Sequence, residues 1–206
     1  MKIAIIGGTG KSGQYLVQQL RQQNFSLRLL VRHQAHYDPS IQVIQGDARD
    51  LATVRTLITG ADAVISTIGQ RGNDLPVFSA ATANIIQAMQ EAHISRYIVT
   101  TGLSVHTPAD QKSPWVVQAT RWMYANYPDT TRDKQTEYEL LLATRLDWTM
   151  IRLPLIELTS AAPGVTASLT DCPSNKISAT SLAAFITDQL QDNTFYSAAP
   201  FVANEV

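Results

Sequence analysis

Short apolar runs alternate with amphipathic segments along most of the chain. Residues 2–6 are almost continuously apolar and end in glycines, which is typical of a buried parallel strand. The segment 12–23 then carries apolar residues at helical spacing, and Asp50 can cap another helix. The same two patterns recur, predicting strands at 27–31, 41–44, 61–67, 96–100 and 148–151 and helices at 51–58, 77–92, 129–144 and 180–190.

This alternation predicts the fold class. Crossovers between parallel strands are right-handed, so the order predicts a doubly wound parallel sheet with helices on both faces, the Rossmann type of α/β fold. No repeat or linker interrupts it, and we expect a single domain over residues 1–206.

Two segments, 102–128 and 153–176, fit this plan poorly. Both follow strand ends on the side where such folds bind ligands, so we expect them to form the substrate side. The first segment carries four aromatic residues, which either form a stacking lid over a substrate or pack a small helical subdomain. These residues are Trp115, Trp122, Tyr124 and Tyr127.

The first predicted strand runs into the glycine-rich loop Gly7-Gly8-Thr9-Gly10-Lys11-Ser12-Gly13. A GxxGxxG spacing between a strand and a helix lets backbone N–H groups and the helix dipole hold the pyrophosphate of NAD(P). Gly10-Lys11-Ser12 also matches the end of the phosphate loop of ATP and GTP hydrolases. That motif needs a glycine at the position of Ile5, which lies inside the strand, so the loop favours a dinucleotide.

Arg32 follows the second predicted strand, where NAD-selective proteins usually carry Asp or Glu. A guanidinium suits the 2′-phosphate of NADP through a bidentate contact, although a solvated surface arginine would give the same pattern. Lys11 adds a second positive charge. We therefore predict a preference for NADP(H), with NAD(H) as a possible cofactor.

The ends of the later strands supply the rest of the predicted cofactor site. Asp47-Ala48 follows the third strand, and Asp47 either accepts from the adenine amino group or caps a turn. Thr67-Ile68-Gly69 should flank the adenosine ribose and the pyrophosphate. Thr101-Gly102 and Pro154-Leu155 end the fifth and sixth strands, and we expect them beside the nicotinamide.

Composition narrows the class of partner. The formal net charge of −1 gives no field that attracts nucleic acid or an anionic membrane, and no run approaches the ~20 apolar residues of a membrane span. The single cysteine, Cys172, fits a reducing cytoplasm. His93 and His106 lack partners at catalytic or metal-binding spacing. We expect a cytoplasmic monomer or homodimer that acts on a small molecule without a metal.

Taken together, the motifs resemble those of the atypical short-chain dehydrogenases/reductases, in the NmrA-like NAD(P)-binding group. The greatest similarity is to the flavin reductase/biliverdin reductase B family, which implies NADPH-dependent reduction of flavins and, in some members, of tetrapyrroles. Two positions depart from that family, because Gly102 stands where a serine is common and Leu155-Ile156 where the flavin reductase has a histidine. The resemblance spans almost the whole chain and rests on the glycine loop, Leu30-Val31-Arg32, Gly46-Asp47, residues 69–75, residues 146–154 and Ile177-Ser178.

No tyrosine has a lysine four residues later, so the Tyr-x-x-x-Lys pair of the usual short-chain dehydrogenases is absent. Lys134 lies in the predicted helix 129–144, where related reductases of aromatic substrates place a lysine, and is alternatively a solvated helix residue. The candidate catalytic residues are Thr101, Ser104 and Lys134.

Hydride transfer to a flavin needs little acid chemistry, because N5 accepts the hydride and its proton can come from water. The protein mainly has to hold two rings together. An apolar floor of Leu103, Pro154, Leu155 and Ile156 would suit that, and Arg71 either contacts a flavin phosphate or is solvated. We predict a reductase of FMN, FAD, a quinone or a similar acceptor. The alternative is a non-catalytic NADP-binding redox sensor of the NmrA-like type.

Overall fold

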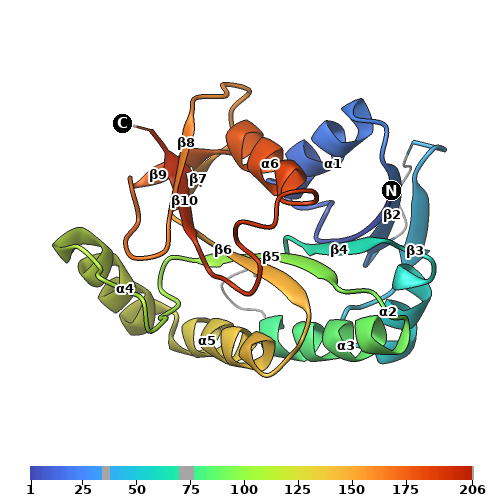
Figure 1. Cartoon of the computed structure of the whole chain (residues 1–206), viewed down its shortest axis with the longest axis horizontal. Helices are drawn as coiled ribbons and strands as arrows, with labels where there is room; N and C mark the ends of the chain where they lie inside the picture. The colour runs from blue at the N-terminus through green and yellow to red at the C-terminus, as the bar shows by residue number, and fades with distance from the viewer. Residues whose placement is uncertain (34–37, 70–76, 206) are drawn as a thin grey trace.

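The computed structural model describes residues 1–33, 38–69 and 77–205. A central eight-stranded sheet is covered on both faces by helices, with α1 and α6 on one face and α2, α3 and α5 on the other (Figure 1). The helices are α1 (Gly13–Gln22), α2 (Leu51–Ile58), α3 (Phe78–Glu91), α4 (Pro114–Asn126), α5 (Pro128–Leu142) and α6 (Ala179–Asp188).

The sheet has the strand order β3-β2-β1-β4-β5-β6-β10-β8. Neighbours from β3 to β10 are parallel, and the order reverses between β1 and β4, which confirms the predicted Rossmann type of fold. The strands are β1 (Lys2–Ile6), β2 (Ser26–Val31), β3 (Gln42–Gln45), β4 (Ala63–Ser66), β5 (Arg96–Gly102), β6 (Asp147–Leu153), β8 (Val165–Ser168) and β10 (Phe201–Asn204).

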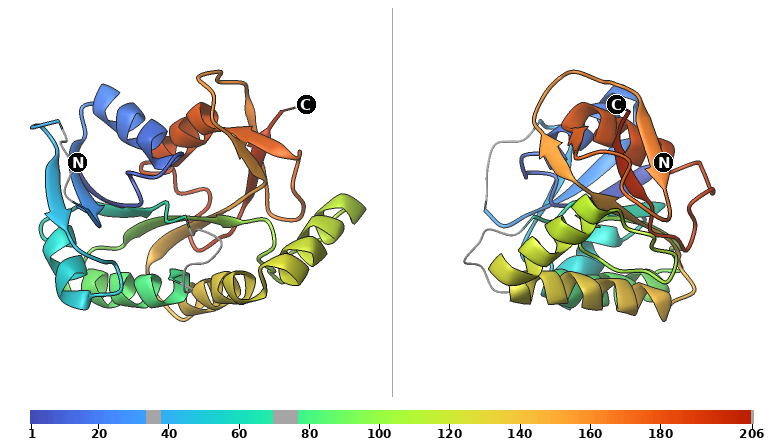
Figure 2. Two further views of the ribbon diagram at one scale, coloured as in Figure 1. Left: turned by 180° about the vertical axis from the view of Figure 1, so that it is seen from behind. Right: turned by 90° about the vertical axis from the view of Figure 1, so that its left-hand side faces the viewer.

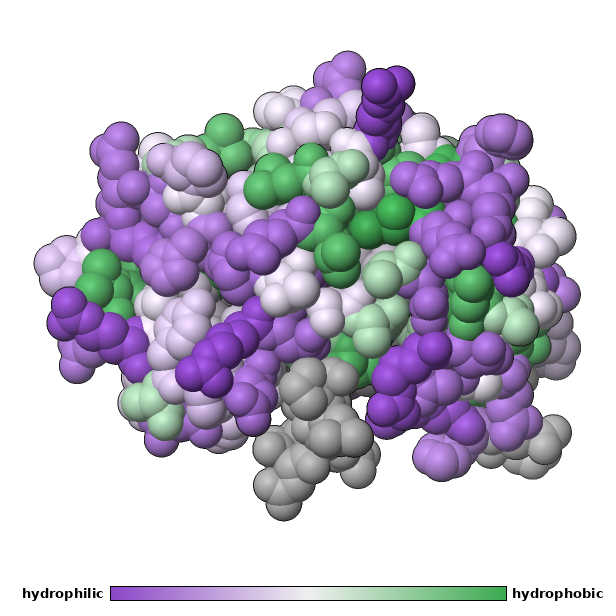
Figure 3. Space-filling view, turned by 90° about the horizontal axis from the view of Figure 1, so that it is seen from below, coloured by the Kyte–Doolittle hydropathy of each residue, from purple (hydrophilic) through white to green (hydrophobic). Residues whose placement is uncertain are grey.

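The apolar strands are buried on both faces. In β1, Ala4 and Ile6 pack into the core beneath α2 and α3, whereas Ile3 and Ile5 pack beneath α1 and α6. Alternate side chains therefore enter opposite cores, which is why the strand is apolar at nearly every position. The helices need only one apolar face, and the outside of the α3 and α5 layer is largely hydrophilic with apolar groups between (Figure 3).

Both segments that fit the alternating plan poorly contain regular structure of their own. Residues 102–128 include α4, which begins at Pro114 and lies beyond α5 at one end of the molecule (Figure 2). Only Val116 and Thr120 of this helix are buried, so its sequence carries little helical periodicity. Residues 153–176 include β8 and the strand β7 (Leu155–Glu157), which pairs with β9 (Lys176–Ser178) in a small second sheet.

The end of the chain adds a strand that the sequence pattern did not predict. β10 lies between β6 and β8, and its pairing with β8 is antiparallel, so the sheet is mixed rather than wholly parallel. Its four residues are all buried, but only three of them, Phe201 to Ala203, are apolar, and so short a segment cannot be identified as a strand by periodicity. The predicted cap of α2 is confirmed, because Asp50 accepts hydrogen bonds from the backbone of Ala52 and Thr53.

Candidate functional site

The carboxyl ends of four parallel strands bring the predicted cofactor residues to one edge of the sheet. Ile6 at the end of β1 pairs with Ser66 at the end of β4. Gly102 at the end of β5 pairs with Leu153 at the end of β6. The glycine loop, 67–69, 101–102 and 154–155 therefore follow adjacent strands on the side where doubly wound folds bind nucleotides.

The glycine loop makes a tight turn that only glycine permits at two positions. Gly7 has a φ of 84°, and a Cβ there would lie 2.5 Å from the carbonyl carbon of Thr67. A Cβ on Gly13 would collide with the carbonyl oxygen of Gly7. The backbone N–H of Gly10 donates to that same oxygen at 2.9 Å. The strand, loop and helix thus pack backbone against backbone, with no side chain between.

The start of α1 retains the positive end of a helix dipole. Ser12 at the N-cap makes no side-chain capping bond, and the first turn contains no acidic residue. Thr9 and Lys11 are exposed beside it. An anion is the natural partner of a helix end left in this state, so the cradle of backbone groups fits a pyrophosphate.

Arg32 and Asp47 lie together at the ends of β2 and β3. Arg32 is exposed, and its charge is one of the causes that lower the pKa of Asp47, after the larger effect of the hydrogen bond from Arg49. The guanidinium of Arg49 lies 2.7 Å from Asp47, and its backbone N–H donates to the same carboxylate at 2.8 Å. Asp47 thus caps a turn, while contact with adenine stays a prediction.

Arg49 is a cation that the sequence interpretation missed. Its guanidinium pairs with Asp47, and the charge of Arg32 acts on the same carboxylate, so two cations lie at the ends of β2 and β3. The sequence feature that could have indicated this contact is the position of Arg49 two residues after Asp47. Ala48 is buried between them, and its carbonyl accepts a hydrogen bond from Asn84 of α3 at 3.0 Å.

The segment after β4 continues the edge. The backbone N–H of Thr67 donates to the carbonyl of Ile6 at 2.8 Å, which fixes it against the glycine loop. Ile68 packs on the core, and a Cβ on Gly69 would meet open space. Arg71, predicted to contact the substrate, lies outside the described residues.

Candidate polar groups approach Gly102 at the end of β5. A Cβ built on this glycine would lie 3.6 Å from both Lys134 Nζ and Ser104 Oγ. The hydroxyls of Ser104 and Thr101 are buried and have no hydrogen-bond partner among the described residues. Unpaired buried hydroxyls cost free energy, and they mark a place where a ligand can supply the missing partner.

Lys134 is not the solvated helix residue that the sequence also allowed. Its Nζ lies 4.8 Å from the centre of the Phe78 ring, close to Gly102. Burial lowers the pKa of Lys134, while the charges of Glu137 and Asp133 raise it. An amine that is partly desolvated in this way is suited to proton transfer.

Behind Lys134 lies a buried polar cluster that the sequence interpretation missed. Thr82 Oγ1 of α3 donates to Glu137 Oε1 at 2.7 Å and lies 3.2 Å from Tyr97 Oη. Burial raises the pKa of Glu137 to about 7 and also raises the pKa of Tyr97. The only sequence signal was an acidic residue on the apolar side of the predicted helix, between Lys134 and Leu141.

The predicted apolar floor is only partly assembled. Leu103 and Pro154 are buried, and Ile156 packs on the core beneath α6. Leu155 is 70% exposed, because it belongs to the short strand β7 outside the main sheet. Leu155 therefore points into solvent and does not form part of a buried surface on which a nicotinamide or flavin ring could pack.

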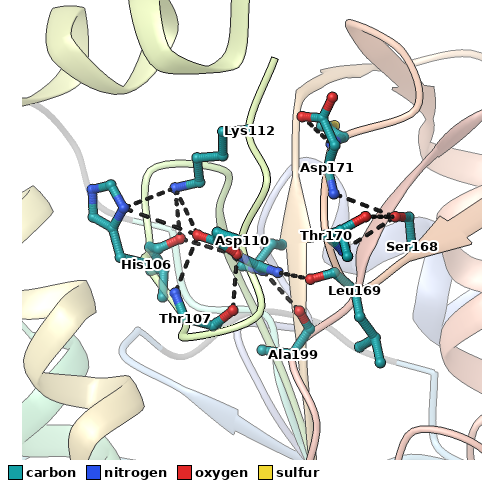
Figure 4. A network of polar contacts seen from close by, with 12 residues as sticks. His106, Thr107, Asp110, Lys112, Ser168, Leu169, Thr170, Asp171 and Ala199 are labelled. Atoms are coloured by element: carbon teal, nitrogen blue, oxygen red, sulfur yellow. Dashed lines mark hydrogen bonds and ion pairs between the residues drawn. The ribbon is translucent and has the colours of Figure 1, made fainter.

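A buried ion-pair network joins the loop 103–113 to the sheet (Figure 4). Arg152 of β6 is fully buried and donates to Asp110 at 2.5 Å and to the carbonyls of Val105, Leu169 and Ala199. Lys112 Nζ lies 3.3 Å from Asp110 and 3.3 Å from His106 Nδ1. Since acceptors surround the guanidinium, the network holds the loop in place. His106 is exposed, and its Nδ1 lies 3.9 Å from Asp110 Oδ2, so its ring borders this network without being buried in it.

The four aromatic residues of 102–128 belong to α4 and its C-cap rather than to one cluster. Trp122 and Tyr127 meet edge to face at 5.7 Å on the surface, and Tyr124 stacks on His106 at 6.3 Å. Trp115 packs against the small core around Phe201. These residues therefore belong to a helical region, which is one of the two alternatives that the sequence offered, and a role as a lid over the substrate stays a prediction.

The model of the family described as NAD(P)H-binding matches residues 7–193. The chain belongs to this NAD(P)H-binding family. The match begins in the glycine loop and includes Lys134, so the site described above lies within it. It confirms the resemblance to NAD(P)-binding reductases that the motifs indicate.

Solved structures of similar fold cover nearly the whole chain. A short-chain dehydrogenase/reductase of Veillonella parvula in complex with NADP is 19% identical, with a TM-score of 0.81 over 98% of this chain and 94% of that one. ChuY of Escherichia coli O157:H7, named as an anaerobilin reductase, is 18% identical, with a TM-score of 0.81 over 99% and 97%. At such identities the likeness shows a shared fold.

Among curated proteins, an uncharacterised protein of Mycobacterium tuberculosis is 33% identical over 109 residues. The match covers 52% of this chain but only 12% of that relative. In the part of the chain that the structure describes, no helix has both the length and the apolar character needed to cross a membrane.

Proposed function

We propose that this protein is an NADPH-dependent reductase that transfers a hydride to a flavin, FMN or FAD, or to a similar conjugated acceptor such as a quinone. The observation that carries the proposal is the amino group of Lys134 beside Gly102, on the same edge as the glycine loop. A fold shared with an anaerobilin reductase also supports a reductase.

The residues of the edge divide into binding and positioning roles. The backbone of Gly7 to Gly13 and the start of α1 hold the pyrophosphate, and Arg32 contacts the 2′-phosphate. NADPH, when bound, supplies the hydride. Thr67, Ile68 and Gly69 lie beside the ribose, while Thr101, Gly102 and Pro154 line the side where the nicotinamide lies. In this proposal, cofactor and acceptor bind to one domain that spans residues 1–206.

Lys134 and Ser104 act on the acceptor. Both lie 3.6 Å from the Cβ position of Gly102, so the two polar groups approach the same strand end and can donate to an acceptor oxygen or nitrogen that packs against this backbone. The acceptor gains two electrons with the hydride, and the N–H bond of Lys134 then breaks to supply the proton that completes the reduction. Leu103 and Pro154 exclude water on the sheet side.

Turnover distinguishes this proposal from the alternative of a redox sensor. Purified protein is mixed with NADPH and with FMN, FAD, a quinone or a linear tetrapyrrole, and the absorbance of the reduced nicotinamide is followed. A rate well above the uncatalysed one supports the reductase. Tight NADPH binding without turnover of any acceptor contradicts it and favours a non-catalytic sensor. The glycine at position 102, where the flavin reductase family commonly has a serine, also favours the sensor.

A further inference from the structure

Glu137 is a carboxyl group buried one helical turn from Lys134. It lies on the face of α5 that packs against α3, and it is 1% exposed. Oε1 accepts a hydrogen bond from Thr82, whereas Oε2 has no partner among the described residues. Ionisation of a buried carboxyl group that lacks hydrogen-bond donors costs free energy, and a nearby cation lowers that cost.

Lys134, three residues before Glu137 on the same helix, is the cation whose charge favours the ionised form of Glu137. The titratable groups around the pair are Asp133 on the same helix and Tyr97 on β5, while α3 contributes the uncharged Thr82 and Phe78. Asp133 is already engaged, because its carboxylate accepts from the backbone of Phe78 at 2.7 Å and caps the start of α3. Glu137 is therefore the carboxylate left to balance Lys134.

We propose that Glu137 is a positioning residue that keeps Lys134 in its ammonium form beside Gly102, ready to give a proton to the reduced acceptor. This inference rests on the function proposed above. When Lys134 has given up its proton, the free amine takes another from water, so each catalytic cycle consumes one hydride from NADPH and one proton from solvent. Glu137 makes no contact with the acceptor.

The direction of its effect follows from electrostatics. Burial raises the pKa of Glu137 to about 7, so above neutral pH the group carries a negative charge. That charge raises the pKa of Lys134. In Glu137→Gln the amide oxygen still accepts from Thr82, but the charge is gone. Because the charge of Glu137 is the largest of the effects that raise the pKa of Lys134, its loss should lower that pKa.

The test is a pH titration of the free protein followed by the ¹³C signal of the lysine Cε atoms. Lys134→Arg identifies the signal by its disappearance. In the wild type, the Lys134 signal should show an inflection near pH 7, as Glu137 ionises, and a second at higher pH. In Glu137→Gln, the first inflection should vanish and the second should move to lower pH. Glu139→Gln removes an exposed charge from the same helix and should leave both unchanged.

An unchanged Lys134 titration in Glu137→Gln overturns the proposal. Should that variant fail to fold, the wild-type curve decides, because absence of the inflection near pH 7 also overturns it. The alkaline limb of kcat should shift with the Lys134 titration, while the KM for NADPH stays constant. The titration uses neither NADPH nor an acceptor, so failure of turnover would contradict the proposed function and leave this result intact.

Discussion

At the scale of single residues, the site consists of charges and hydroxyls placed at strand ends. Arg32 and Arg49 lie at the end where we propose that the 2′-phosphate binds. Ser104 and Lys134 lie at the other end, around Gly102. Each group takes its chemical character from how far it is removed from water, since burial changes the proton affinity of Lys134 and Glu137 in opposite directions.

Replacing Arg32 with aspartate should weaken NADPH binding by tenfold to a hundredfold and NADH binding far less. The reason is the loss of a charge-assisted contact with the 2′-phosphate, worth about 1.5–3 kcal/mol, together with repulsion from the new carboxylate. Fluorescence titration with both cofactors gives the two Kd values. Arg132→Asp, on the exposed face of α5, is the control. Equal losses for the two cofactors would exclude Arg32 as the selectivity residue.

Replacing Glu137 with glutamine should make stability depend less on pH. The folded pKa of Glu137 is raised to about 7, above its value of 4.5 in an unfolded chain, so its contribution is fully present below pH 4.5 and is lost as pH rises through 7. Wild type should therefore lose about 2–3 kcal/mol relative to the variant between pH 4.5 and pH 8. Urea unfolding at both pH values measures this. A pH dependence identical to that of Glu139→Gln would contradict the assignment.

At the scale of elements, the position of the site follows from how α1 and α5 begin and pack. The glycine loop brings α1 against the end of β4 without an intervening side chain. Asp133 caps α3 from α5, which aligns the two helices and places Lys134 over Phe78. The distance from Lys134 to Gly102 is thus set by the packing of α5 on α3 rather than by the loop that follows Gly102.

Gly13→Ala should destabilise the protein and abolish most of its affinity for NADPH. The new methyl group would collide with the carbonyl oxygen of Gly7, so α1 has to move away from the loop. Gly102→Ala is the matched control for folding, since its Cβ would make only ordinary contacts of 3.6 Å. Thermal unfolding should separate the two variants by several degrees. Equal melting temperatures would show that the loop is looser than described.

At the scale of the whole molecule, the buried network of Arg152 and Asp110 joins the loop after β5 to the part of the sheet formed by β6, β10 and β8. Arg152 reaches Val105 on the loop, Ala199 before β10 and Leu169 after β8. One side chain thus fixes segments that are distant in sequence, including the loop that carries Leu103 and Ser104. The loop that we propose to line the substrate side is therefore held by the mixed part of the sheet.

Asp110→Asn should cost about 3–5 kcal/mol of stability, because it leaves the fully buried guanidinium of Arg152 without its counter-charge. Chemical denaturation measures the loss, and Asp129→Asn, at an exposed pair with Arg132, should change stability by less than 1 kcal/mol. Similar values for the two variants would mean that Arg152 is stabilised by the backbone carbonyls alone.

The sequence by itself determined the parallel part of the fold and the nature of the cofactor. Buried parallel strands must be apolar on both faces, and a loop that packs backbone on backbone must be glycine, so both leave local patterns. The alternation of strands and helices, the glycine loop and the Asp50 cap could be predicted for this reason.

Only the tertiary structure decided the surroundings of Lys134 and Gly102, where we propose that the acceptor binds. The contacts of Glu137 with Thr82, of Asp133 with Phe78 and of Arg152 with Asp110 join residues 42 to 55 positions apart. Such pairs leave no period in the sequence, because each partner is an ordinary polar residue until packing removes it from water. The same holds for α4, which packs against α5 and the small core around Phe201, and for β10, which pairs between β6 and β8.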